Sequence, residues 1–293
     1  MAEVALSERR HGRETASRPR EHALFSLVTT ATAAASEDSG GFHVPTIAEF
    51  FPPPVLFEGT VFELNRVMLI RLFATVVLCT LFWLAARRAT LVPGRGQNLA
   101  EMALDFVRVQ VAEEILGKEK SRRWVPLLTV IFFAVLAMNI TGVVPGLNLA
   151  GSAVIGFPLV MAVMSYVAFI VAGVKAHGAA GYLKASLLPS GVPWPVYFIL
   201  TPIEFISTFV LRPATLTIRL LVNMVSGHML LVLCFSATQY LFFEAGVALK
   251  AMGAVTLAAG FAFTIFEIFI AALQAYIFTL LTAAYIGTSL EDH

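Results

Sequence analysis

Residues 195–243 read PVYFILTPIEFISTFVLRPATLTIRLLVNMVSGHMLLVLCFSATQYLFF and form an almost unbroken apolar tract. A second apolar tract of similar length, residues 246–287, follows after a short interruption. As an α-helix each tract would be roughly 60 to 70 Å long, about twice the hydrocarbon thickness of a bilayer. Each tract must therefore cross the membrane strongly tilted, break, or cross it twice.

The composition of the whole chain agrees with a location in the bilayer. Hydrophobic residues make up 58% of the 293 residues and charged residues only 13%, against about 25% charged residues in a typical soluble domain. This excludes an ordinary cytosolic enzyme, and the net charge of +1 gives no indication of a nucleic-acid partner. The two cysteines, Cys79 and Cys234, lie in apolar runs and offer neither a disulfide framework nor a CxxC metal site. We expect an all-α polytopic membrane protein without cofactor or metal.

Three shorter apolar segments precede the long tracts, at about residues 67–86, 124–144 and 154–174. The first has about 20 residues, which matches the thickness of a bilayer. It ends at Arg87 and Arg88, which the positive-inside rule places in the cytoplasm. One crossing for each long tract gives five spans, and two crossings give seven. Both schemes place the N-terminus outside and the C-terminus in the cytoplasm.

Residues 98–116 predict a helix of a different kind. Glu101 and Asp105 share one helical face, whereas Leu99 and Met102 share another. A helix with so many charges does not cross lipid, so we expect it to lie along the membrane surface.

Two further segments precede the first span. Residues 1–40 contain a basic, then an apolar, then a small-residue stretch, which is the order of a secretory signal; the alternatives are a disordered extension and a start codon placed too far upstream. Residues 41–63 contain three successive prolines, at 52–54, which forbid a continuous helix and predict a pre-membrane loop. The membrane domain then comprises residues 64–293.

The first long tract contains the charged residues Glu204, Arg212 and Arg219. An ionised side chain costs at least about 2.5 to 3.5 kcal/mol at the centre of a bilayer, so residues of this kind are usually functional. His228 lies nine residues after Arg219, about half a turn around the helix. Its side chain therefore points away from Arg219, towards a different face of the helix. One polar stripe along the helix is formed by Arg212, Thr215, Arg219, Asn223 and Ser226.

The second tract has a row of residues that recur every seven positions and therefore stay on one face. The glycines of this row allow close helix packing, and Gln274 can hydrogen-bond between helices. Packing does not require a carboxylate, so Glu267 indicates a function. The row consists of Gly246, Gly253, Gly260, Glu267 and Gln274.

Three stretches resemble subunit a of the rotary F-type ATP synthase: IEFISTFVLRP (203–213), RLLVNMVSGH (219–228) and FEIFIAALQAYIFTLLTAAYI (266–286). The resemblance runs from about residue 62 to the end. It implies that Arg219 is the family's essential arginine, with Asn223 and Gln274 as its polar neighbours. It also implies five spans plus the surface helix, with the two long tracts forming a strongly tilted hairpin that curves around a ring of small rotor subunits.

Two features depart from the family pattern. Many bacterial members have Glu nine residues after the arginine and His seven residues before the glutamine, whereas this chain has His228 and Glu267 at these positions. The imidazole and the carboxylate are exchanged, but both are present. Glu204 lies nine residues before Pro213 instead of the usual eight, which turns its side chain by about 100° unless a helix bulge absorbs the extra residue.

The resemblance implies a stator subunit with two aqueous half-channels that carry protons to and from rotor carboxylates. His228 and Glu267 can hold and release protons and are assigned to the half-channel open to the outside, with Glu204 as a further half-channel residue. Arginine stays protonated, so Arg219 would instead draw a rotor carboxylate into its ionised form and block a leak between the half-channels, while Asn223 and Gln274 hold its guanidinium in place. Support of the helix face or interface is assigned to Arg212, Thr215 and Ser226.

The polar and charged residues also have structural interpretations. For His228 the alternative is a hydrogen bond between helices. For Arg212 it is a side chain that reaches the membrane interface or stabilises the fold. For Arg219 it is a buried ion pair with Glu204 or Glu267.

The expected partners are the rotor ring, the peripheral stalk subunits and the catalytic ATPase headpiece, in a bacterial plasma membrane. Because HExxH, GxSxG and a complete P-loop are absent from the sequence, we do not expect an enzyme by itself. His228 and Glu267 favour protons over sodium as the transported ion. The alternative function is an ion-coupled secondary transporter with its own substrate site, but the repeated halves common in such proteins are not visible.

Overall fold

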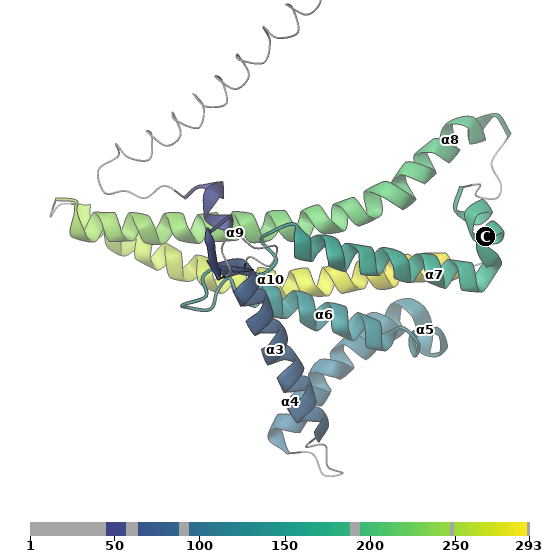
Figure 1. Ribbon diagram of the computed structural model, residues 1–293, viewed down its shortest axis with the longest axis horizontal. Helices are drawn as coiled ribbons and strands as arrows, with labels where there is room; N and C mark the ends of the chain where they lie inside the picture. The colour runs from purple at the N-terminus through teal and green to yellow at the C-terminus, as the bar shows by residue number, and fades with distance from the viewer. Residues whose placement is uncertain (1–44, 57–63, 88–93, 188–193, 247–248, 292–293) are drawn as a thin grey trace, which may run out of the picture. The chain divides into compact units, whose positions relative to one another are not determined.

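The computed structural model describes residues 45–56, 64–87, 94–187, 194–246 and 249–291. These ranges are almost entirely helical (Figure 1), which confirms the all-α class. Two short antiparallel strands, β1 (Pro54–Leu56) and β2 (Leu64–Asn65), pair just before the first long helix. The helices are η1 (Ile47–Phe50), α3 (Arg66–Arg87), α4 (Arg95–Asp105), η2 (Phe106–Glu113), α5 (Glu114–Ser121), α6 (Val125–Ile140), α7 (Gly156–Leu187), α8 (Trp194–Ile206), η3 (Ser207–Leu211), α9 (Arg212–Phe243) and α10 (Lys250–Leu290).

Five apolar helices make up the polytopic architecture. Four are long and apolar enough to cross a bilayer: α3, α7, α10 and the continuous helix of 48 residues that runs from α8 through η3 into α9. The fifth, α6, has 16 residues, or about 24 Å of helix. Each long tract is a single helix with one direction, which excludes the two crossings per tract that the sequence left open.

The described chain divides into two compact units, one of residues 232–260 and one of residues 46–231 and 261–291. In the first unit the chain segments of α9 and α10 run antiparallel. The Thr238 hydroxyl donates a hydrogen bond to Thr256 Oγ1 at 2.9 Å, and Gly260 lies against the ring of Phe235. The second unit contains the hydrophobic core and every ionisable residue that the sequence assigns to the site.

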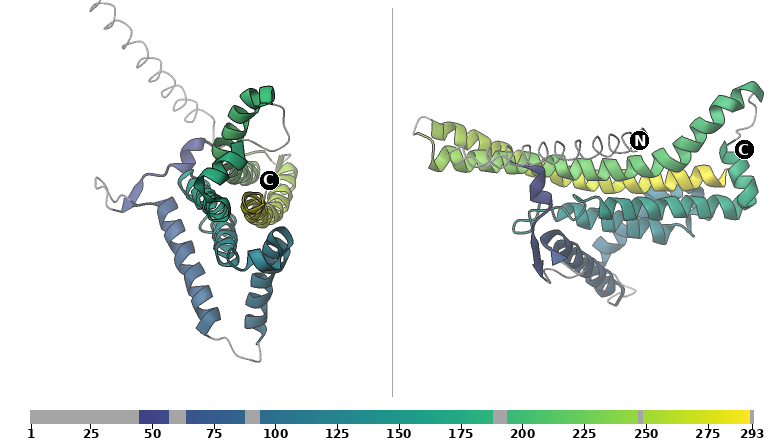
Figure 2. Two further views of the ribbon diagram at one scale, coloured as in Figure 1. Left: turned by 90° about the vertical axis from the view of Figure 1, so that its right-hand side faces the viewer. Right: turned by 45° about the horizontal axis from the view of Figure 1, so that its top comes forward.

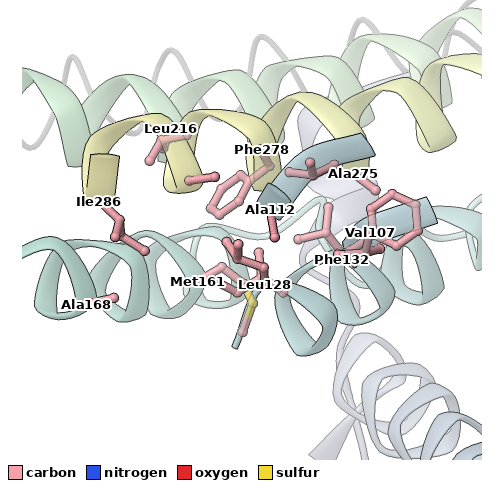
Figure 3. Close-up of a cluster of buried hydrophobic side chains, with 14 of the residues drawn as sticks. Val107, Ala112, Leu128, Phe132, Met161, Ala168, Leu216, Ala275, Phe278 and Ile286 are labelled. Atoms are coloured by element: carbon pink, nitrogen blue, oxygen red, sulfur yellow. The ribbon is translucent and has the colours of Figure 1, made fainter. Parts of the chain in front are cut away.

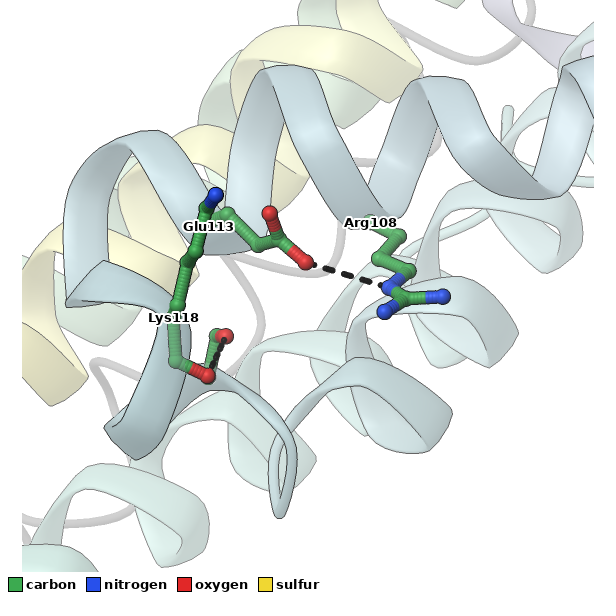
Figure 4. Close-up of polar contacts among 4 residues, drawn as sticks. Arg108, Glu113 and Lys118 are labelled. Carbon is green, nitrogen blue, oxygen red and sulfur yellow. Dashed lines mark hydrogen bonds and ion pairs between the residues drawn. The ribbon is translucent and has the colours of Figure 1, made fainter.

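The predicted surface helix is one helix that changes its pitch. It begins as α4, widens into the π-helical η2, and is interrupted inside α5 at Gly117, where φ is 74°. The wide π turn brings residues five apart close together, so Arg108 Nε donates to Glu113 Oε1 at 3.1 Å (Figure 4). The sequence pattern predicted this helix at 98–116, whereas it begins at Arg95 and runs to Ser121 with the interruption at Gly117. The change of pitch was not predicted.

The two halves of this helix differ in burial. In η2, Val107 and Val111 are fully buried in the bundle. In α4, Leu99 and Met102 remain 70% and 64% exposed. The open apolar face of α4 fits a helix that lies in the membrane interface, while η2 anchors it to the protein.

The chain turns compactly between α6 and α7. α6 ends four residues before the end predicted at 144, because the Thr141 hydroxyl accepts the Gly151 N–H at 2.9 Å and the chain folds back. The buried Asn139 side chain donates to the carbonyl oxygen of Ala271 in α10 at 3.4 Å. The first contact closes the turn, and the second ties the end of α6 to α10.

α7 extends beyond the span predicted at 154–174 and is kinked. Gly178, with a φ of 74°, interrupts the helical geometry, and the following residues turn back. The ring of Tyr182 therefore packs on Gly173, where a Cβ atom would lie 2.2 Å from the ring atom Cδ2. Only glycine fits at this position without displacing the ring.

The core of the larger unit lies among η2, α6, α7, α9 and α10 (Figures 2 and 3). Leu128 of α6 and Phe278 of α10 are completely buried there. A hydrogen bond of 2.8 Å between Ser165 of α7 and Thr282 of α10 satisfies the two hydroxyl groups inside this apolar cluster. The core thus fixes the face of α10 that carries the polar residues of the site.

We predict that Gly173→Ala destabilises the protein by about 1 to 3 kcal/mol, because the added methyl group overpacks the contact with Tyr182. The midpoint of thermal unfolding in detergent measures the effect. Gly96→Ala is the matched control, since no atom lies within 4 Å of the added Cβ. An unchanged midpoint for Gly173→Ala would contradict the described kink of α7.

Candidate functional site

α9 and α10 are joined by a hydrogen bond between amide side chains. Asn223 Nδ2 donates to Gln274 Oε1 at 2.8 Å. Gln274 is 2% exposed, and its Nε2 atom has no hydrogen-bond partner among the described residues. A buried amide donor without a partner is rare in folded proteins, so this pair marks a polar point on an otherwise apolar helix contact.

Glu267 of α10 packs against Gly227 of α9. A Cβ atom on Gly227 would be 2.7 Å from Glu267 Oε1, so the absence of a side chain at Gly227 makes room for the carboxyl group. Glu267 is 5% exposed, and its Oε2 atom has no hydrogen-bond partner among the described residues. A carboxyl group that is buried and only partly satisfied is expensive, which is the pattern of a functional rather than a packing residue.

Arg219 is exposed on the apolar surface of α9. Its neighbours Ile218 and Val222 are 57% and 52% exposed. Within the described residues its guanidinium makes no hydrogen bond or ion pair. The expectation that Asn223 and Gln274 hold this guanidinium is not what the structure shows, since these two amides bond to each other.

His228 is 7% exposed and lies beside a residue that the sequence analysis did not single out. Its Nε2 atom is 3.5 Å from Oε2 of Glu49 in η1. Its ring also meets the edge of Phe50, with centroids 5.0 Å apart. No sequence signal identified Glu49, because it lies outside the long tracts in a segment predicted as a loop.

Arg212 is held by aromatic rings of two other helices. Its Cζ atom lies 5.0 Å from the ring centroid of Tyr285 in α10 and 5.9 Å from that of Phe169 in α7. Cation–π contacts of this kind compensate a charge inside an apolar region. The contacts favour the stabilising role over a side chain that reaches the interface.

Glu204 lies in α8, half-buried, on the other side of Arg219 from His228 along the helix. Between Glu204 and Pro213 the chain forms the π-helical η3. A π turn takes up one extra residue, so it is the bulge that can offset the spacing of nine residues.

The two hydroxyl residues of the polar stripe bond to their own helix. Thr215 Oγ1 donates to the Leu211 carbonyl oxygen at 2.7 Å, and Ser226 Oγ donates to the Asn223 carbonyl oxygen at 3.1 Å. Both side chains are exposed on the helix surface. These hydrogen bonds therefore make no contact across to another helix.

Two arginines of α3, which the sequence analysis did not single out, hold the loop between α6 and α7. Arg71 donates from Nε to the carbonyl oxygen of Gly151 at 2.7 Å and from Nη2 to that of Val154 at 2.9 Å. Arg66 Nη2 donates to the Leu147 carbonyl oxygen at 3.0 Å. Backbone carbonyl groups thus compensate both charges at the start of a membrane helix.

The described residues contain no group of three or more His, Cys, Asp or Glu side chains that could hold a metal ion. The site therefore consists of hydrogen-bonding and ionisable side chains. Such groups can bind, attract or pass on protons and oppositely charged groups.

The fold and the site define a helical, polytopic membrane protein with ionisable side chains inside its membrane domain. Comparison with known families gives a match of residues 68–287 to the model described as ATP synthase A chain. The chain therefore belongs to this family, whose members are subunits of the ATP synthase complex. The match covers both long tracts but neither Glu49 nor Arg66.

Individual relatives support the family assignment. ATP synthase subunit a of Rhodococcus erythropolis is 51% identical over 250 residues, which cover 85% of this chain and 91% of the relative. Those of Pseudarthrobacter chlorophenolicus and Parafrankia sp. are 39% and 40% identical, over 89% and 86% of this chain and 98% and 86% of the relatives.

We predict that Gly227→Ala lowers the rate of ATP synthesis by membrane vesicles at least threefold, because the added methyl group displaces the Glu267 carboxyl group. The amount of assembled complex should stay unchanged. Adding Glu267→Asp to Gly227→Ala should recover part of the rate, since the shorter side chain leaves room for the methyl group.

Gly287→Ala serves as the control, because its added Cβ would meet its nearest neighbour, Leu116 Cδ2, at an ordinary 3.5 Å. A parental rate of ATP synthesis in Gly227→Ala would show that the close approach of Gly227 to Glu267 is not required for function.

Proposed function

We propose that this chain is the stator subunit of the ATP synthase membrane sector and provides two aqueous half-channels for protons. The observation that carries the proposal is the exposed guanidinium of Arg219 between Ile218 and Val222. An arginine facing hydrocarbon costs at least about 2.5 to 3.5 kcal/mol. A partner that brings a carboxylate to this surface would remove that cost.

A ring of rotor subunits with carboxylates is such a partner. Beside the fixed cation, a rotor carboxyl group is favoured in its ionised form and releases its proton. Arginine stays protonated, so Arg219 itself passes no proton between the two sides. The same side chain can therefore discharge the rotor group and block a direct leak.

The proton-holding residues lie on opposite sides of Arg219 along the helix. His228 is nine residues towards one end, about 13 Å of helix. Glu204 is fifteen residues towards the other end, about 22 Å. We assign His228 and Glu267 to the half-channel open to the outside and Glu204 to the one open to the cytoplasm. A proton then reaches the ring on one side and leaves on the other, which couples proton flow to rotation.

The remaining polar residues position this machinery. The bond between Asn223 and Gln274 fixes α9 against α10 beside Arg219, and the buried Nε2 of Gln274 keeps one donor for a passing group. Arg212 stabilises the junction of α7, α9 and α10, while Thr215 and Ser226 lie on the same exposed surface as Arg219.

The proposal extends to assembly and location. The partners are the rotor ring, the peripheral stalk and the catalytic headpiece, and this chain carries no catalytic site of its own. It lies in a bacterial plasma membrane with the N-terminus outside and the C-terminus in the cytoplasm. A secondary transporter would enclose its binding residues between helices, whereas Arg219 lies on an outer surface.

We predict that Arg219→Ala abolishes ATP-driven acidification of inverted membrane vesicles while the complex still assembles, because the rotor carboxyl group then has no fixed cation to discharge it. Arg219→Lys tests charge alone and should retain little pumping, since a point charge does not reproduce the planar guanidinium. Quenching of a pH-sensitive dye measures the rate.

Arg95→Ala removes an exposed arginine from α4 and is expected to pump at the parental rate. If Arg219→Ala pumps protons at the parental rate, the proposed stator function is wrong.

A further inference from the structure

The short helix η1, which precedes α3 in the chain, is held in place beside α9. η1 is only four residues long, but its Phe50 is 2% exposed and packs in a cluster with Val67 and Met224. The plane of the Phe50 ring makes an angle of 68° with that of His228. This edge contact fixes the position of the imidazole and of η1 together.

The two oxygen atoms of the Glu49 carboxyl group have different surroundings. Oε1 accepts the backbone N–H of Thr46 at 3.1 Å, which orients the carboxyl group. Oε2 is the atom that faces His228 Nε2 at 3.5 Å. The side chain of Glu49 is 23% exposed and that of His228 only 9%, so the carboxyl group is the more accessible of the two.

Other ionisable groups lie near His228 on neighbouring helices. Arg66 of α3 interacts electrostatically with it, and Glu267 of α10 lies against Gly227, the preceding residue. Arginine releases no proton. The groups able to exchange protons are therefore Glu49, His228 and Glu267, in order from the N-terminal segment to α10.

We propose that Glu49 is the outermost proton relay of this chain and exchanges protons between the outside water and His228. The proposal rests on the proposed half-channel function and adds to it a residue from outside the long helices. Glu49 lies in the segment before the first span, which is the outer side in the assigned orientation. Exposure decreases from Glu49 to His228, as a path from water into the protein requires.

The transfer step is a simple proton exchange. The protonated Glu49 carboxyl group donates its proton to Nε2 of neutral His228, which leaves a carboxylate beside an imidazolium. The imidazolium passes a proton on towards Glu267, and outside water protonates Glu49 again. A separation of 3.5 Å needs only a small tightening for direct exchange, which is common between resting and working geometries.

The test is Glu49→Gln in the intact ATP synthase, measured as ATP-driven acidification of inverted vesicles and as ATP synthesis driven by an imposed proton gradient. Glutamine keeps the size of the side chain and an oxygen atom for the Thr46 N–H, but it transfers no proton. We expect both rates to fall about tenfold or more, with normal assembly and normal ATP hydrolysis by the detached headpiece. Glu49→Asp should recover part of the rate.

Glu114→Gln, which changes an exposed carboxylate of α5, is the matched control and should leave both rates unchanged. Parental rates in Glu49→Gln would overturn the relay and leave Glu49 as a structural contact only. Should Glu49→Gln fail to assemble, parental rates in an assembled Glu49→Ala would overturn it equally. Arg219→Ala, measured in parallel, separates the two proposals: if it pumps normally, the stator function itself fails.

Discussion

A charged side chain inside a bilayer has to be matched by water, by an opposite charge or by hydrogen bonds, and the membrane domain is organised around this requirement. Arg71 is matched by backbone carbonyl groups and Arg212 by aromatic rings. His228 has Glu49 beside it. Arg219 has no such match among the described residues. This exposed cation of α9 is therefore the basis of the proposal that a rotor subunit completes the surface.

The scaffold is built to hold these groups in place. The apolar core packs α10 against α6 and α7, and the amide pair joins α10 to α9. Gly227 leaves the space that Glu267 fills, and the π-helical η3 absorbs an extra residue between Glu204 and Arg212. A glycine and a π-helical turn thus help to set the positions of Glu267 and Glu204.

The sequence predicts much of this architecture because apolar length and charge spacing are local properties. It locates the five apolar helices and predicts a surface helix that ends at 116, next to the interruption at Gly117. Only the resemblance to the ATP synthase family brings Asn223 and Gln274 into one site. It does not reveal Glu49, whose proximity to His228 depends on how Phe50 packs across 178 residues of chain. Nor does it reveal the loop contacts of Arg71, because hydrogen bonds to distant carbonyl groups leave no pattern in the sequence.

Oxidative cross-linking tests most directly whether the surface around Arg219 faces the rotor. After replacement of Cys79 and Cys234, Val222→Cys in α9 is combined with single cysteines along the outer helix of the rotor subunit. Val222 is 52% exposed, and Val163→Cys in α7, 47% exposed, is the comparison position. The account predicts a cross-linked product for position 222 and none for 163. A product at 163 and none at 222 would contradict it.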